Sequence, residues 1–92
     1  MNPATNPLEL DAINAVVVGT GAIGSAFVSE LLSRLQVHKV FILHRGTAPS
    51  FADPRVHCIR FDALSPTTIT DAAAAVGQIS QRIHLLINTV GM

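Results

Sequence analysis

The segment VVVGTGAIGSAF constrains this chain more than any other part of its sequence. Residues 15–18 form a short, continuous run of small and β-branched apolar side chains, which is typical of a strand buried on both faces of a parallel sheet. The run ends at Gly19. Residues 22–35 follow with apolar side chains four apart from Ile23 to Leu35 and with Val28 and Leu32 beside them, which predicts an amphipathic helix.

The hexapeptide GTGAIG between this strand and helix matches the pattern G-x-G-x-x-G. In that position the pattern is a fingerprint of dinucleotide binding. Gly19 would permit the tight turn, Gly21 would let a pyrophosphate approach the backbone, and Gly24 would let the helix pack closely on the sheet. Free N–H groups at the positive helix end would hold the phosphates. We therefore expect the loop, including Thr20 and Ile23, to bind a dinucleotide, and a turn whose glycines serve only packing is the alternative.

The rest of the sequence predicts three more apolar strands and a second helix. The strands are expected over residues 39–43, 56–61 and 83–87, and the helix is expected to follow Ser65 as its N-cap and to run to about residue 82. Apolar strands alternating with helices, joined by right-handed crossovers, predict an α/β fold of the Rossmann type. The expected architecture is a partial parallel sheet in the strand order 3-2-1-4 with flanking helices.

Composition favours one small soluble unit and excludes several functional classes. Of the 92 residues, 49% are hydrophobic, and 6 basic residues balance 6 acidic ones, which gives no electrostatic footprint for nucleic acid or an anionic membrane. Cys58 is the only cysteine, so neither a disulfide within the chain nor a multi-cysteine zinc site is expected. We expect a cytoplasmic protein with a flexible arm over residues 1–12 and the N-terminal part of an NAD(P)-binding domain over residues 13–92.

The residues after the second predicted strand indicate which dinucleotide is bound. In NAD enzymes an acidic residue about 20 positions beyond the fingerprint binds the ribose hydroxyls. Here that region holds His44 and Arg45 and no acid. A guanidinium suits a 2′-phosphate, and a charge-assisted hydrogen bond of about 1.5–3 kcal/mol would favour one cofactor by roughly ten- to a hundredfold. Arg45 therefore predicts NADP, with NAD as the second choice, and a solvated arginine at a strand end is the alternative.

Polar residues also follow the third and fourth strands, where they extend the pattern to a known family. The order of elements, an aspartate after the third strand and the segment LIN-x-x-G after the fourth resemble the N-terminal half of short-chain dehydrogenase/reductases, particularly their C-factor-like branch. The resemblance implies that Asp62 and the Ala63 backbone contact the adenine. It also implies that Asn88 and Gly91 line the cofactor crevice. The glycine loop departs from the family pattern T-G-x-x-x-G-x-G, because it is one residue tighter.

The same resemblance identifies what the sequence lacks. The family performs its chemistry with a serine, a tyrosine and a lysine that lie beyond the fourth strand, and this chain contains no tyrosine. We therefore assign no catalytic residue and no metal ligand. The sequence is interpreted as an NADP(H)-binding segment of an oxidoreductase whose longer parent transfers hydride between a carbonyl and an alcohol. Because the fourth strand would then form an apolar sheet edge, we expect self-association there or assembly with a missing C-terminal half.

Two other interpretations stay open at this stage. One is a non-catalytic NAD(P)-binding module or a truncated product, which is consistent with the absence of tyrosine. The other is an ATP-binding domain, because VVVGTGAIGSAF also resembles the nucleotide loop of ubiquitin-activating-type adenylating enzymes. Those enzymes place an acid after the second strand, where this chain has His44 and Arg45, so this interpretation ranks lower.

Overall fold

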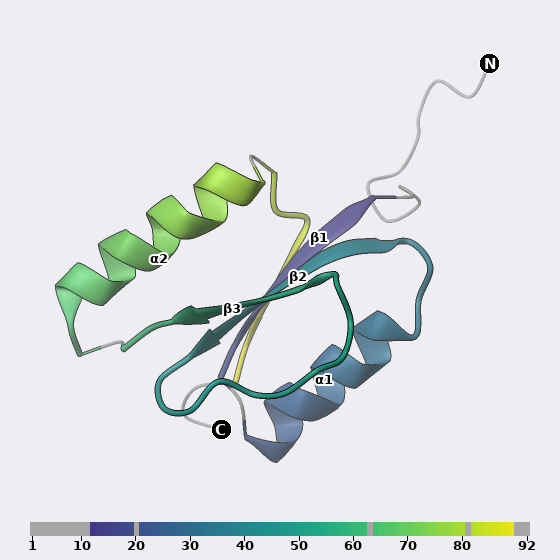
Figure 1. Cartoon of the computed structure of the whole chain (residues 1–92), viewed down its shortest axis with the longest axis horizontal. Coiled ribbons are helices and arrows are strands. Elements are labelled where there is room, and N and C mark those ends of the chain that lie inside the picture. The colour runs from purple at the N-terminus through teal and green to yellow at the C-terminus, as the bar shows by residue number, and fades with distance from the viewer. Residues whose placement is uncertain (1–11, 20, 63, 81, 90–92) are drawn as a thin grey trace.

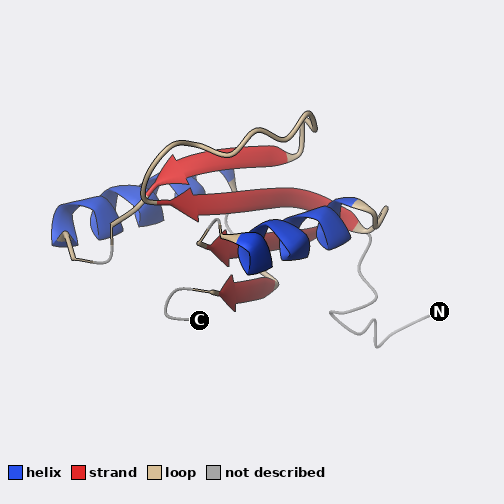
Figure 2. Ribbon diagram, turned by 90° about the horizontal axis from the view of Figure 1, so that it is seen from below, coloured by secondary structure: helices blue, strands red, loops and turns tan. Residues whose placement is uncertain are grey.

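The chain folds into a four-stranded parallel sheet with one helix on each face (Figure 1). The computed structural model describes residues 12–19, 21–62, 64–80 and 82–89. Seen from below, the strands lie one above another, with α1 in front and α2 behind (Figure 2). The sheet order β3-β2-β1-β4 confirms the Rossmann-type α/β prediction. In chain order the elements are β1 (Ile13–Val18), α1 (Ala22–Leu32), β2 (Val37–His44), β3 (Val56–Arg60), α2 (Pro66–Ile79) and β4 (Leu85–Asn88).

Strand β1 lies inside the sheet and is buried on both faces. It pairs in parallel with β2 on one side and with β4 on the other, so that Val16 stands beside Phe41 and Leu86. Ala15 and Val17 are fully buried. A strand that is covered by a helix on each face has no solvent side, which explains why its sequence shows no polar alternation.

Two apolar clusters hold the layers together. On the α1 side of the sheet, Val28 and Leu31 pack with a group that includes Val17 and Ile42. On the α2 side, Phe41 packs with Val16, Val18 and the partly buried residues around them. Phe41 is fully buried and supplies the largest side chain of the core. The sheet is therefore anchored more firmly to α1, whose buried face reaches the central strands, than to α2, in which Ala72 is the one buried residue among those described.

The buried face of α1 agrees with the expected one only in part. Leu31 of the predicted stripe and Val28 beside it are buried, whereas Ile23 is 49% exposed and Leu35, beyond the helix end at Leu32, is 97% exposed. The buried residues of α1 are Gly24, Val28 and Leu31. Gly24 packs directly on the turn after β1, and the helix ends before Leu35, so the buried face is narrower than the apolar stripe.

Helix α2 begins where predicted, directly after Ser65, but it is shorter than predicted. It ends at Ile79 instead of running to residue 82, and although Ser65 occupies the N-cap position, its side chain makes no capping hydrogen bond. The local contacts come instead from Thr68, whose hydroxyl accepts a hydrogen bond from the backbone N–H of Asp62 at 3.0 Å and donates to the carbonyl of Ser65 at 2.8 Å. A threonine inside the first turn therefore ties the helix start to the end of β3.

The link from α2 to β4 is fastened at the amino end of the sheet by Asn14. Its side-chain amide donates to the hydroxyl of Ser80 at 2.8 Å and to the carbonyl of Arg82 at 3.0 Å. Its backbone N–H donates to Nδ1 of His84 at 3.0 Å, and its carbonyl accepts the His84 backbone N–H at 2.9 Å. Asn14 is 8% exposed, and its amide nitrogen and backbone groups fix where β4 starts, whereas its buried Oδ1 has no hydrogen-bond partner among the described residues.

Arg55 closes the opposite side of the same sheet end. Its guanidinium donates to the carbonyls of Leu32, Arg34 and Val37, at 2.6, 3.0 and 3.1 Å, and it also forms an ion pair with Asp53 at 2.8 Å. The Leu32 carbonyl ends α1, the Arg34 carbonyl lies in the turn that follows, and the Val37 carbonyl starts β2. The end of a helix leaves carbonyl groups without intrahelical partners, and the guanidinium supplies donors there. One side chain therefore joins the helix end, the next strand and the turn before β3.

Removing this arginine should destabilise the fold. We expect Arg55→Met to lower the midpoint of thermal unfolding by several degrees, because three backbone acceptors lose a charged donor.

The Arg55 guanidinium also lowers the pKa of Asp53 from 3.8 to about 2, chiefly by hydrogen bonding. Because the folded state then binds this proton less readily than the unfolded state, the stabilisation is present above pH 3.8 and is lost as the pH falls toward about 2.

Urea unfolding at several pH values would measure this effect in wild type and in Asp53→Asn. The variant should show a smaller loss of stability across the acid window. Asp71→Asn is the matched control, because Asp71 is exposed on α2 and lies outside both ion pairs of the described residues. Identical pH profiles for wild type and Asp53→Asn would contradict the assignment.

Strand β4 forms an edge of the sheet and exposes apolar side chains. Leu85 is 37% exposed and Leu86 is 65% exposed. Such an edge offers unpaired backbone groups to another chain. The predicted apolar edge is therefore present, whereas self-association through it stays a prediction. No helix within the described ranges is long and apolar enough to cross a membrane.

We expect the isolated chain to associate as its concentration rises. Placing a charge on the edge should oppose this association, because charged side chains on edge strands disfavour pairing with a second sheet. Sedimentation velocity over a concentration series would compare wild type with Leu86→Lys, and Leu64→Lys would serve as the control because Leu64 is also exposed but lies outside the sheet. A wild-type monomer at every concentration would contradict the expectation.

Candidate functional site

The described candidate residues gather at the carboxyl edge of the sheet. The four strands end there at Val18, His44, Arg60 and Asn88, and the glycine loop leaves β1 at the same edge. Ligands of open α/β sheets bind outside this edge. Three of the predicted site residues, Thr20, Ala63 and Gly91, lie outside the described residues.

Gly19 makes the turn out of β1 and has a conformation that favours glycine. Its φ is 104°, in the region that side chains with a Cβ rarely adopt. Its N–H donates to the carbonyl of Leu43 at 2.9 Å, which keeps the turn attached to β2. A Cβ at this position would also collide with the hydroxyl of Thr89. The requirement for glycine here is therefore both conformational and steric.

Gly24 is required because α1 lies directly on that turn. A Cβ at Gly24 would collide with the carbonyl oxygen of Gly19 and would stand 3.3 Å from the hydroxyl oxygen of Thr89. Thr89 is itself fixed, because its hydroxyl donates to the carbonyl of Val18 at 2.8 Å and its N–H donates to the same oxygen at 2.9 Å. The family resemblance places Thr89 in the segment from Asn88 to Gly91, which is expected to line the cofactor crevice and brace the sheet. Its contact with the glycine loop was not predicted, because it depends on the docking of β4 beside β1.

Gly21 differs from the other two glycines because the protein itself does not fill the space beside it. No heavy atom lies within 4 Å of a Cβ built on Gly21. The residue is the N-cap of α1, with φ −65° and ψ −173°, and no side chain caps the helix. The first turn of an α-helix leaves backbone N–H groups without intrahelical acceptors. Packing explains Gly19 and Gly24, whereas Gly21 leaves an open approach to the positive helix end.

This contrast predicts opposite results for two alanine substitutions. Gly24→Ala forces a methyl group into backbone and should destabilise the fold by about 1–3 kcal/mol or more. Gly21→Ala should stay within about 1 kcal/mol of wild type, since alanine fits the space and is only a poorer N-cap. Chemical denaturation of both variants would measure the difference. Equal losses would show that the loop packs differently.

The carboxyl end of β2 presents one cation and no acid. His44 is 8% exposed, and its Nδ1 lies 2.9 Å from the carbonyl oxygen of Gly46, so this ring supports the turn. Arg45 follows at the surface and takes part in neither of the two ion pairs found among the described residues. Its side chain is therefore available to an anion that approaches the end of the sheet.

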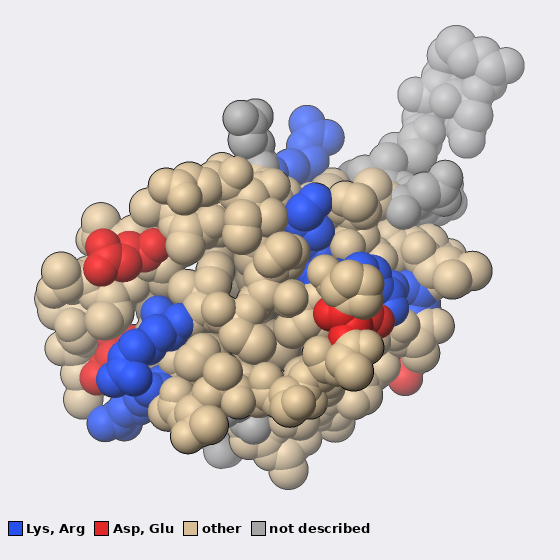
Figure 3. All heavy atoms as spheres, in the orientation of Figure 1, with Lys and Arg blue, Asp and Glu red and all other residues tan. Residues whose placement is uncertain are grey.

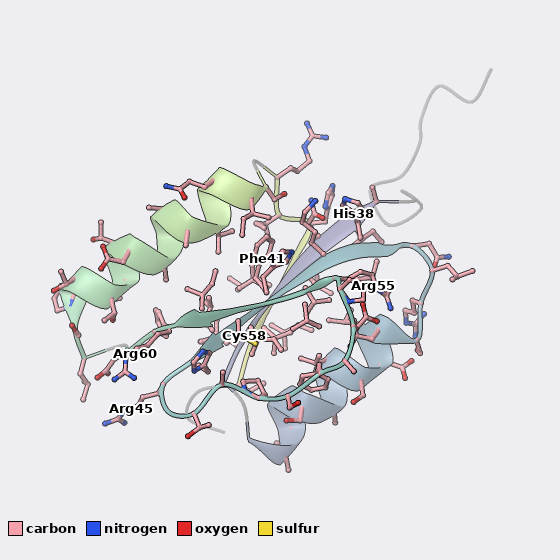
Figure 4. All side chains as sticks on the ribbon, in the orientation of Figure 1. His38, Phe41, Arg45, Arg55, Cys58 and Arg60 are labelled. Carbon is pink, nitrogen blue, oxygen red and sulfur yellow. The ribbon has the colours of Figure 1, made fainter. Side chains whose placement is uncertain are left out.

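A second arginine lies at the same end and was missed by the sequence analysis. Arg60 is the last residue of β3 and pairs in register with His44 of β2. The next residue, Phe61, donates its N–H to the His44 carbonyl at 2.7 Å, which continues the pairing. Aligning the two predicted strands by their carboxyl ends would have revealed the pair. Figure 4 labels Arg45 and Arg60 side by side at this end.

Asp62 is held mainly by its own turn. Its Oδ1 accepts the backbone N–H of Leu64 at 2.9 Å, and its carbonyl accepts the hydroxyl of Thr68 at 2.9 Å. These contacts agree with a turn residue, and contact with an adenine stays a prediction. Asn88 ends β4 beside Val18 and is exposed. Ile23 stands half-exposed in the first turn of α1, next to Gly21.

The histidines and the cysteine have structural surroundings elsewhere. His57 stacks on Phe41 with 5.3 Å between ring centroids, and His84 accepts the hydrogen bond from Asn14. The Cys58 thiol lies 3.8 Å from the carbonyl of Pro49, and burial raises its pKa, which disfavours the reactive thiolate. Within the part of the chain that the structure describes, no group of three or more such residues could hold a metal ion.

Comparison with known proteins yields a structural match. No protein-family model matches the chain, and no curated protein matches it. Among solved structures, the NADPH-bound carbonyl reductase from chicken fatty liver is similar, with a TM-score of 0.74 and 28% sequence identity. The match covers 91% of this chain and 36% of that one, so the chain spans about a third of the length of the reductase. The fold is thus similar to that of short-chain dehydrogenase/reductases, and the C-factor-like branch stays a prediction.

Proposed function

We propose that this chain is the NADP(H)-binding portion of an oxidoreductase similar to short-chain dehydrogenase/reductases. The observation that carries the proposal is the open space at Gly21, in a loop whose other two glycines are already explained by packing. A loop that served packing alone would need no glycine there. The likeness to a carbonyl reductase that was solved with NADPH bound supports the same cofactor.

The residues present fit the pyrophosphate of such a cofactor. Gly21 lets the backbone approach the phosphates, and the first turn of α1, with Ile23 at its surface, turns N–H donors toward them. Gly19 and Gly24 do not need to touch the ligand, because they set the position of the helix end on which binding depends. No basic side chain is required at the pyrophosphate, in agreement with a chain of zero formal charge.

Arg45 would decide between the two nicotinamide dinucleotides. It stands at the surface directly after β2, where an NAD enzyme carries an acid for the ribose hydroxyls. A guanidinium in this position can hold a 2′-phosphate through two parallel hydrogen bonds. We propose that Asp62, with the neighbouring Ala63 backbone, borders the adenine. Asn88 and Gly91 would border the crevice beyond β4, and Thr20 would complete the phosphate loop.

The chain's own residues would bind and orient the cofactor. The bound dinucleotide supplies the hydride chemistry, which in the longer parent would interconvert a carbonyl and an alcohol. This sequence contains no tyrosine to move the proton that accompanies hydride transfer, so no catalytic step is assigned to it. That absence also favours a second candidate, a non-catalytic NAD(P)-binding module, which would use the same site.

Ligand-induced stabilisation would test the proposal. A ligand that binds only the folded state at a hundred times its Kd stabilises it by about 2.7 kcal/mol. We expect NADPH to raise the unfolding midpoint and NADH to raise it less. Arg45→Gln should remove most of this difference, with roughly a tenfold or greater loss of NADPH affinity and little change for NADH.

Two variants control for charge and for glycine content. Arg82→Gln removes an exposed arginine at the amino end of the sheet, and Gly77→Ala replaces a glycine of α2 that also has open space around it. Both should keep wild-type ligand responses, whereas Gly21→Ala should lose affinity for both dinucleotides. Stabilisation by ATP alone would support the adenylating-enzyme interpretation and overturn this proposal.

A further inference from the structure

We infer that Arg60 is a second specificity residue, which binds the 2′-phosphate of the cofactor together with Arg45. The inference rests on the proposed function and extends it from one cation to a pair supplied by two different strands. It follows from where the parallel register places Arg60, from the absence of an ion-pair partner for its guanidinium among the described residues, and from the charges around it.

The strand register places Arg60 close to Arg45, so that a phosphate bound by Arg45 would lie within reach of Arg60. Strands β2 and β3 pair in parallel and end together, with His44 opposite Arg60. Neighbouring strands of a sheet lie about 4.8 Å apart, so Arg60 starts one strand spacing from the residue that precedes Arg45. Figure 4 shows the two arginine side chains at the same end of these strands.

Neither arginine is engaged within the part of the chain that the structure describes. Arg34 is paired with Glu30, and Arg55 is paired with Asp53, each at 2.8 Å. By contrast, the guanidinium groups of Arg45 and Arg60 form neither of the two ion pairs found among the described residues, and both residues are exposed. Figure 3 shows basic atoms gathered over this end of β2 and β3. Both guanidinium groups are therefore available to an anion.

The neighbouring groups explain why one cation would be insufficient. His44 bonds its own turn through Gly46 and is buried, so its ring does not face an incoming phosphate. Asp62 stands two residues after Arg60, and its carboxylate would repel a phosphate dianion that approached Arg45 alone. The guanidinium of Arg60 would offset this repulsion of the phosphate. Arginine suits the role because its planar group presents paired donors to phosphate oxygens.

The test uses ligands that carry only the adenosine half of the cofactor. Adenosine 2′,5′-bisphosphate and adenosine 5′-monophosphate differ by the 2′-phosphate, and titration calorimetry would give both affinities for the full chain. We expect Arg60→Gln to weaken the bisphosphate roughly tenfold and to leave the monophosphate unchanged. Arg60→Lys, which keeps the charge but loses the paired donors, should fall between wild type and Arg60→Gln. Arg82→Gln should match wild type for both ligands.

The results separate this inference from the function on which it rests. If Arg45→Gln loses preference for the bisphosphate while Arg60→Gln and Arg60→Lys retain it, the role of Arg60 is overturned and the proposed function stands. If wild type binds both ligands equally, or binds neither, the NADP assignment fails and the Arg60 inference fails with it. Far-UV circular dichroism of each variant would confirm that the sheet and helices are retained. If Arg60→Gln does not fold, Arg60→Lys decides the outcome by the same criterion.

Discussion

The close approach of α1 to the turn after β1 is the constraint on which the rest of the structure depends. Gly24 lies against the carbonyl of Gly19, and Thr89, the residue after β4, lies close to both and donates its hydroxyl to the carbonyl of Val18. This contact holds α1 against the sheet, and Gly24, Val28 and Leu31 form its buried face. It also fixes the direction of the helix axis at the carboxyl edge of the sheet, where the free N–H groups are found.

The sequence was sufficient to predict the strands, their order and the glycine loop, because buried parallel strands and the G-x-G-x-x-G spacing are local patterns. It failed where the outcome depended on contacts between distant segments. The apolar stripe of α1 predicted the burial of Leu31, yet Ile23 and Leu35 at its two ends are exposed. Ser65 matched an N-cap, but Thr68 makes the bonds. Arg60 gained meaning only from its pairing opposite His44, which no single segment encodes.

The proposed binding edge and the packed interior use different chemistry. The interior relies on apolar clusters on both faces of the sheet and on two polar anchors at the amino end, Asn14 and Arg55. The carboxyl edge carries exposed arginines and an open helix end, which contribute little to packing. This separation explains how a chain of zero formal charge can offer a concentrated cationic site. Substitutions at the edge can alter ligand preference at little cost to the fold.

The contact of Thr89 with Val18 indicates when the glycine loop is completed during folding. Its hydroxyl reaches Val18 across a sequence separation of 71 residues, so the loop receives its last support only after β4 has docked. Contacts between distant segments form late because closing a long loop costs entropy before any contact compensates for it. A nucleotide that recognises the finished loop would therefore select chains whose sheet is complete, and its binding would report the final step of assembly.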